Sequence, residues 1–202
     1  MIWYDSYVVT TSKGGVYMNV TLIVVLVVLA VIILSMISIY NSLIRGRNSV
    51  EEAFSTMDVY LKKRFDLIPN LVETVKGYAS HEKDTLERVI AARNSIASAA
   101  NTSEKIEGET ALSGALRQIF ALSESYPDLK ANQNFMDLSS QLKAVEEDIA
   151  NARKYYNAVV KHYNNNVMMF PSNLIAGMFH FEKAPMFELD DASERKNVKV
   201  SF

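Results

Sequence analysis

Residues 20–39 read VTLIVVLVVLAVIILSMISI, and this stretch decides how the chain is organised. It contains no charged residue, and its polar side chains are Thr21, Ser35 and Ser38. A helix of this length, at about 1.5 Å per residue, covers about 30 Å, the thickness of the hydrocarbon core of a bilayer. Tyr17 and Tyr40 flank the stretch, at the level where aromatic rings favour the headgroup boundary. The sequence therefore predicts one transmembrane helix over residues 20–40.

Two other structures are compatible with an apolar run of this kind: a cleaved signal peptide and a buried core helix. A signal peptide has an apolar region of about 7–15 residues and a small-residue cleavage site. This run is longer, and no such site follows it. A core helix normally carries some polar face, and this one has none. We therefore favour the transmembrane interpretation over both.

The charges on either side of the span predict its orientation. Arg45 and Arg47 follow it closely, whereas the flank before it has only Lys13 and the α-amino group. Basic residues near a span favour the cytoplasmic side. We therefore expect a short N-terminal segment, residues 1–19, outside the cell inner membrane, and the large domain in the cytoplasm. Met18 is an alternative start of the protein.

The chain after the span shows amphipathic helical patterns. Apolar residues recur at steps of three, four and seven over residues 43–68, so we expect one continuous rod from the bilayer to about Leu67. Pro69 lacks an amide donor and is expected to end or kink this rod. A second helical pattern covers residues 71–96, with Ser80 as a candidate N-cap for a restart.

Residues 101–109 are polar and include Gly108, which indicates a loop. A third helix follows from Leu112 and is expected to stop at Pro127. A fourth helix has the clearest period, with one set of residues recurring every seven positions and a second set three positions later. The two sets are Phe135, Leu142, Ile149, Tyr156, Tyr163 and Phe170, and Leu138, Val145, Ala152 and Val159. Pro171 is expected to end this helix.

These patterns predict an all-α fold. The transmembrane helix is followed by a long antiparallel bundle of about four helices over residues 41–170. An intramolecular bundle is favoured over an intermolecular coiled coil, because four amphipathic helices joined by short polar loops close a core by themselves.

The last segment, residues 171–202, is expected to be an irregular apolar tail. Pro171, Gly177 and Pro185 interrupt it, so it is too broken to span a bilayer. Packing over the end of the bundle, lying at the membrane surface and docking on a neighbouring subunit are all compatible with it. Residues 198–202 alternate apolar and polar side chains, as one added strand would.

Composition limits the classes of function. The formal net charge is −2, so the chain lacks the strongly basic balance that nucleic-acid binding calls for. The chain has no cysteine, which excludes disulfides, thiol nucleophiles and thiolate zinc sites. The expected partners are the lipid bilayer and proteins, and no nucleic acid.

No constellation of residues typical of catalysis is present. The histidines are His81, His162 and His180, on different predicted elements. His81 and Glu82 begin like a zinc-protease motif, but the second histidine of that motif is missing. The consecutive carboxylates at 146–148 indicate a solvated face. We expect no catalytic, cofactor-binding or metal-binding residues and no enzymatic activity.

Arg64 is the one polar residue that stands out, because it falls on the apolar seam of the first helix. An unpaired buried charge costs several kcal/mol, so Arg64 needs a partner. Asp66, Glu73 and Asp148 are the candidates. A satisfied salt bridge at a helix junction is favoured over a ligand site.

Two stretches carry a resemblance to a known family. Residues 40–94 read YNSLIRGRNSVEEAFSTMDVYLKKRFDLIPNLVETVKGYASHEKDTLERVIAARN, and residues 155–188 read YYNAVVKHYNNNVMMFPSNLIAGMFHFEKAPMFE. Both closely resemble the LemA family of bacterial membrane proteins, over nearly all of residues 18–202. The resemblance implies an N-terminal anchor, an antiparallel helical bundle, a cytoplasmic body and no established enzymatic activity. Residues 1–17 are an extra segment, and Phe54 stands where the family pattern leads us to expect tryptophan.

The leading functional hypothesis is a single-pass, membrane-anchored helical scaffold that associates with itself or with other membrane proteins. The alternative is a signalling or sensory transducer that couples the short outer segment to the cytoplasmic bundle, although that segment is too short to fold a ligand-binding domain. A helical enzyme would require a pocket that combines several titratable groups with a strongly perturbed carboxylate.

Overall fold

The structure is a computed structural model that describes the backbone of residues 13–187 and the side chains of residues 20–187. Over this range it contains six helices and no strand: α1 (Lys13–Tyr78), α2 (Lys83–Ser98), α3 (Thr102–Ser123), α4 (Pro127–Lys130), α5 (Gln133–Met168) and α6 (Ser172–Met178). The predicted all-α fold is confirmed. The strand expected over residues 198–202 lies outside the described residues.

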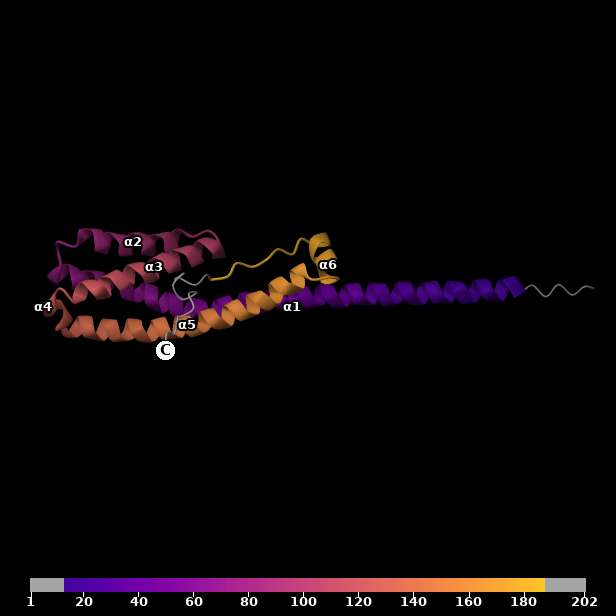
Figure 1. Cartoon of the computed structure of the whole chain (residues 1–202), viewed down its shortest axis with the longest axis horizontal. Coiled ribbons are helices and arrows are strands. Elements are labelled where there is room, and N and C mark those ends of the chain that lie inside the picture. Colours follow the sequence, from indigo (N-terminus) through magenta and orange to yellow (C-terminus); the bar gives the residue numbers. More distant parts are fainter. Residues whose placement is uncertain (1–12, 188–202) are drawn as a thin grey trace, which may run out of the picture.

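The first helix, α1, joins the apolar stretch to the bundle without a break. Figure 1 shows it as a single rod whose N-terminal part extends bare from one end of the bundle. Its most apolar window of 18 residues has a mean hydropathy of 3.4, and none of it is buried. Within the described part of the chain it is the one helix long and apolar enough to cross a membrane. Lipid is the environment in which so much exposed apolar surface is stable.

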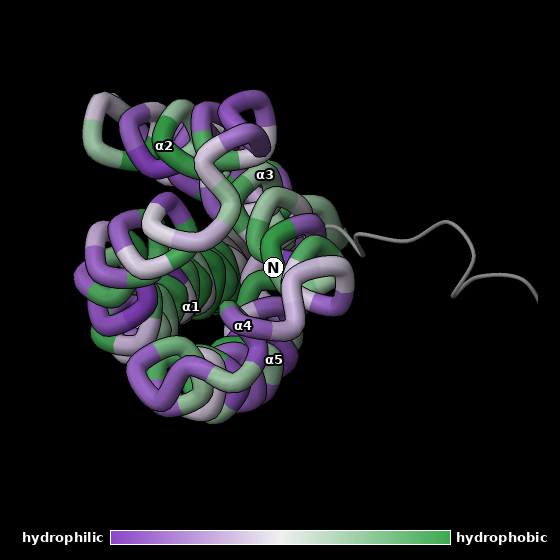
Figure 2. The backbone as a smooth tube through the Cα atoms, turned by 90° about the vertical axis from the view of Figure 1, so that its left-hand side faces the viewer, coloured by the Kyte–Doolittle hydropathy of each residue, from purple (hydrophilic) through white to green (hydrophobic). Residues whose placement is uncertain are grey.

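The other half of α1 is one of the helices of the bundle. It packs along α5, which runs in the opposite direction, and α2 and α3 form a hairpin beside them (Figure 1). Viewed along the bundle, the four long helices surround a common interior (Figure 2). The central core residues are fully buried: Ile68, Leu71, Val75, Leu112, Ile119 and Leu142.

The prediction that the first helix ends at Pro69, near Leu67, is wrong, because α1 continues to Tyr78 with Pro69 inside it. The alternative, a kink at Pro69, stays a prediction. A proline leaves the carbonyl four residues earlier without its amide donor. Here that carbonyl belongs to Phe65, and the Arg93 Nε–H from α2 donates to it at 3.5 Å. The Arg93 guanidinium also lies 4.0 Å from the centroid of the Phe65 ring. A side chain from another helix thus replaces the missing donor. The break comes later, and α2 begins after Glu82 rather than at Ser80.

The loop predicted over residues 101–109 is also wrong. Asn101 caps α3 instead, since its side chain accepts a hydrogen bond from the Glu104 amide at 3.0 Å. Gly108 lies inside the helix, where an added Cβ would stand 2.8 Å from Ile96 Cγ1 of α2. This glycine therefore permits close packing of α2 on α3 and does not mark a turn. Pro127 opens the short helix α4, while α3 ends at Ser123.

The long periodic helix agrees with the sequence analysis. α5 runs from Gln133 to Met168, within two residues of the predicted heptad stretch. Ile149 is 1% exposed, and Leu142 and Val145 are completely buried beside it. The seven-residue seam is therefore the face that α5 presents to the core. Its last predicted member, Phe170, is an exception, because it lies beyond the end of α5 and is 78% exposed.

The segment after Pro171 is more regular than predicted. It begins with α6, which returns to α1 and buries Ile175 and Ala176. A strap, residues 179–187, then follows: after a turn at residues 179–180 it runs back along α5, and its Phe181 and Phe187 are buried. The sequence left open three ways to cover the apolar tail. Packing on the chain's own bundle covers the four buried side chains, Ile175, Ala176, Phe181 and Phe187.

Candidate functional site

The C-terminal strap is held by a regular set of side chains on α5. Asn164 donates from its amide to the Ala184 carbonyl at 2.9 Å and accepts from the Ala184 amide at 2.8 Å. Asn157 makes the same pair of bonds with Phe187, at 2.9 and 3.0 Å. Between them, the Tyr156 hydroxyl donates to the Pro185 carbonyl at 2.8 Å. All five bonds reach the backbone of the strap, so they would hold an extended chain of almost any sequence.

The spacing of these side chains follows from the helix. Tyr156-Asn157 and Tyr163-Asn164 are the same dipeptide repeated after seven residues, so both asparagines lie on one face, two turns apart. Tyr156 and Tyr163 belong to the predicted heptad, and both are buried. The role of the asparagines was not predicted. The repeated Tyr-Asn pair was the available signal.

A cavity of about 600 Å³ lies beside the strap. Its walls come from α1, α5 and the strap, and include Arg47, Glu51, Tyr163, His180 and Glu182. The Arg47 guanidinium stands 5.6 Å from the centroid of the Phe181 ring, which also fixes the strap to α1. The Tyr156 ring packs edge-on against Phe54 and Phe187, with centroids 5.7 and 5.8 Å away. The strap is thus embedded in an aromatic groove with polar walls.

A second polar cluster lies deeper, around Arg64 of α1, whose side chain is 0% exposed. Its Nη1 donates to Glu146 Oε1 of α5 at 2.5 Å and to Ser113 Oγ of α3 at 2.6 Å. Its Nη2 donates to the carboxylate of Glu109 on α3 and to the Glu109 carbonyl, the latter at 3.3 Å. One guanidinium thereby ties three helices together.

The predicted need for a partner is confirmed, but the candidate partners Asp66, Glu73 and Asp148 are not the ones used. Asp66 pairs instead with the exposed Lys62, at 2.5 Å. The expectation of a solvated face at 146–148 is wrong for Glu146, which turns inward to Arg64.

The ionisation of this cluster follows from its burial and its charges. Burial works to lower the pKa of Arg64, but the negative charges of Glu146 and Glu109 outweigh it and raise that pKa above its ordinary value. Burial raises the pKa of the Glu109 carboxyl, against the lowering effect of Arg64. The Glu109 carboxylate, whose pKa is raised, is therefore bound to the Arg64 guanidinium. Such a buried ion pair is better suited to holding helices together than to transferring protons.

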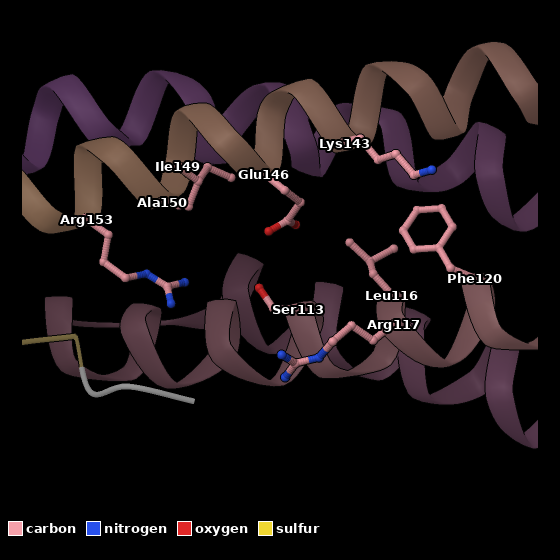
Figure 3. A pocket seen from close by; sticks show the side chains of 9 residues that line it. All are labelled: Ser113, Leu116, Arg117, Phe120, Lys143, Glu146, Ile149, Ala150 and Arg153. Carbon is pink, nitrogen blue, oxygen red and sulfur yellow. The ribbon is translucent and has the colours of Figure 1, made fainter. Parts of the chain in front are cut away.

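The space between α3 and α5 forms a cavity of about 350 Å³ next to this cluster. Figure 3 shows the Glu146 carboxylate and the Ser113 hydroxyl turned toward each other across it, with Arg117, Lys143 and Arg153 around them. Glu146 is engaged by Arg64, as described above. The Arg153 guanidinium lies 4.9 Å from the Phe187 ring centroid.

The three histidines of the sequence lie apart in the structure, as their places on different predicted elements led us to expect. His81 lies between α1 and α2, His162 on α5 and His180 in the strap, and all three are exposed. Within the described side chains, no group of three or more His, Cys, Asp or Glu could hold a metal ion. The expectations of no metal, cofactor or catalytic residue remain predictions.

These observations define a class of protein: an all-α bundle that starts from a long apolar helix and is fastened by its own C-terminal strap. The chain belongs to the LemA family, whose family model matches residues 53–202. The resemblance drawn from the sequence is confirmed.

Curated relatives agree with this assignment. The chain is 25% identical over 164 residues to Protein LemA of Metamycoplasma hominis, covering 79% of this chain and 72% of that protein. It is 27% identical over 181 residues to each of Magnetosome protein MamQ 1 and MamQ 2 of Paramagnetospirillum magneticum, covering 77% of this chain and 66% of each of those proteins.

Proposed function

We propose that this protein is a non-enzymatic, membrane-anchored scaffold that assembles with copies of itself by exchanging C-terminal straps. The observation that carries the proposal is the set of five hydrogen bonds from Tyr156, Asn157 and Asn164 to the strap backbone. The same segment of a neighbouring copy meets this groove with identical complementarity, which makes exchange a low-cost route to oligomers.

The anchor supports this assembly. A single span over residues 20–40 in the inner membrane confines all copies to two dimensions, with residues 1–19 outside and the bundle in the cytoplasm. Confinement raises the local concentration of straps around each groove, so a weak contact is sufficient for association. Because α1 continues without a break into the bundle, the grooves of neighbouring copies would lie at the same distance from the membrane.

Two measurements on detergent-solubilised full-length protein test the proposal. A photo-crosslinking amino acid at Phe187 should give a covalent dimer, whereas the same group at the exposed Tyr155 should not. The assembled mass should fall on replacing both Asn157 and Asn164 by alanine. It should stay unchanged in Asn165→Ala, a matched change at an exposed position of the same helix. A one-chain mass for the wild type, or crosslinks only within one chain, would overturn strap exchange.

The transducer function is the second candidate, and the continuity of α1 from Lys13 to Tyr78 favours it. A single rod would carry a displacement of the outer segment directly into the bundle. Replacement of residues 1–12 by an unrelated polar sequence separates the two functions. A scaffold keeps its assembled mass and its hydrogen-exchange pattern, whereas a transducer changes one of them.

A further inference from the structure

Apolar side chains remain exposed around α6, at the end of the bundle from which the bare part of α1 emerges (Figure 1). We name this group the α6 patch: Met168, Met169, Phe170, Leu174, Met178 and Phe179. Phe170 is 78% exposed and Met178 is 60% exposed. So much adjoining apolar surface needs a cover, since water disfavours it.

The packing of α6 fixes the height of the patch along α1. Its buried face, Ile175 and Ala176, packs in one cluster with Leu43, Ile39 and Met36. One turn after Ile175, the Phe179 ring lies 4.8 Å from the ring of Tyr40, also on α1. Because the apolar stretch ends at Ile39, the α6 patch stands beside the last turn of the span rather than beside the body of the bundle.

Along the axis of α1, the residues around the patch change from uncharged to basic, as expected at the boundary of a bilayer. No Asp, Glu, Lys or Arg occurs in residues 163–179. The exposed Arg45 and Arg47 follow on α1, about 9–12 Å beyond Ile39 along the helix axis. That places two positive charges at the depth of the phosphates, outside the hydrocarbon. An apolar layer at the end of the span, with a basic layer next to it, fits a lipid surface.

We propose that the α6 patch inserts into the boundary between acyl chains and headgroups, on the side of the membrane that carries the bundle. The lipid-facing surface of α1 would then continue directly onto α6, and the bundle would be seated on the membrane by two contacts instead of one. A short interfacial helix with one buried and one lipid-facing side behaves in this way. The inference rests on the proposed anchor and holds for either orientation of the span.

Fluorescence quenching in vesicles tests the proposal with the full-length protein. The single tryptophan, Trp3, is first replaced by phenylalanine, and Met178→Trp then places a probe in the patch. Ile32→Trp is the reference inside the span. Val59→Trp is the matched control, because Val59 is an apolar residue that is 68% exposed on the part of α1 within the bundle. Phosphatidylcholine vesicles brominated either near the headgroup or deep in the acyl chain supply the quencher.

The Met178→Trp probe should be quenched several-fold more than the Val59→Trp probe, and more by shallow than by deep bromines. The Ile32→Trp probe should show the opposite depth preference. A Met178→Trp probe that is as insensitive to bromine as the Val59→Trp probe would overturn the inference. In that case a blue-shifted emission would assign the cover to a second protein copy. If the Ile32→Trp probe also escapes quenching, the anchor itself fails. Circular dichroism confirms that each variant keeps its helicity.

Discussion

A guanidinium without exposed surface is stable inside this bundle because two neighbouring helices, α3 and α5, supply it with oxygen atoms. Arg64 binds two carboxylates and a hydroxyl, so its charge is compensated where water is excluded. The compensation is mutual, because Glu109 is 1% exposed and has Arg64 as its counter-charge. Each member of the cluster therefore depends on the others.

Arg64→Met should destabilise the folded protein by about 3–5 kcal/mol, because it leaves Glu109 buried without a counter-charge. Adding Glu109→Gln should recover part of the loss, since the carboxylate that remains without Arg64, Glu146, is 35% exposed and reaches water. Lys62→Met, which breaks the exposed pair with Asp66, should cost less than about 1 kcal/mol. Denaturant unfolding followed by circular dichroism measures all three. Equal effects of the Arg64 and Lys62 changes would contradict this account.

Tyr156 should make stability fall at alkaline pH. Burial raises the pKa of its phenol to about 12, from an ordinary value of 10.0. The folded state then keeps a proton that the unfolded state has lost, so the contribution is complete below pH 10 and disappears as the pH rises toward 12. The slope is at most about 1.4 kcal/mol per pH unit.

Tyr156→Phe provides the comparison for this pH dependence. At neutral pH the variant should be less stable by about 0.5–1.5 kcal/mol, because it loses the hydrogen bond to the Pro185 carbonyl. Above pH 10 the stability of the wild type should fall to that of the variant and then below it, since phenylalanine does not ionise. Curves that run parallel from pH 8 to pH 12 would show that Tyr156 does not titrate as inferred.

At the scale of the elements, the passage of α1 through Pro69 depends on α2. The Phe65 carbonyl has Arg93 as its substitute donor, so Arg93→Ala should cost about 1–2 kcal/mol through the lost hydrogen bond and the lost ring contact. In a Pro69→Ala background the amide returns, and the same change should cost less by at least about 0.5 kcal/mol. A double-mutant cycle measures this coupling, and additive effects would remove Arg93 from the explanation.

The heptad face of α5 supplies a second test at this scale. Ile149→Ala should destabilise the protein by about 2–5 kcal/mol, because the residue is 1% exposed in a close-packed core. Glu147→Ala, two positions away on the exposed side, should cost under about 0.5 kcal/mol. Thermal unfolding of both variants is the measurement. Similar small effects would mean that this face of α5 is not the core.

Elements whose patterns are local were predictable from the sequence. The apolar stretch and the α5 heptad each contain their whole signal, so both were recognised as helical, and α5 was found within two residues at each end. The errors arose where a distant helix decides the outcome. Pro69 is bypassed because α2 supplies Arg93, and Gly108 is helical because α2 needs its space. α6 was missed because its stability comes from packing on α1.

The same distinction applies to the candidate site. Arg64 was recognised as needing a partner, since its place on the apolar seam is visible in the sequence. Its partners were not, because Glu109 lies in a polar run that resembles a loop, and Glu146 is one of three consecutive acidic residues. Only the packing of α3 and α5 on α1 selects them. The strap likewise requires knowledge of where the chain turns after α6.

At the scale of the whole molecule, the bare rod, α6 and the strap meet at one end of the bundle. Arg45 and Arg47 lie there, next to the end of the apolar stretch, and Arg47 also contacts the strap through Phe181. The orientation of the molecule therefore decides in which compartment the groove and its strap operate. It also decides which lipid leaflet would meet the α6 patch.

Labelling of single cysteines should establish that orientation, and the absence of native cysteine makes the result unambiguous. Ser6→Cys should react with a membrane-impermeant maleimide in intact cells, because the basic residues after the span favour retention of the bundle inside. Glu147→Cys, at an exposed position of α5, should react only after the membrane is permeabilised. Replacing Arg45 and Arg47 by glutamine should weaken this preference and label part of the Glu147→Cys protein in intact cells. Immediate labelling at Glu147→Cys with protection at Ser6→Cys would reverse the orientation and move the scaffold to the outer face.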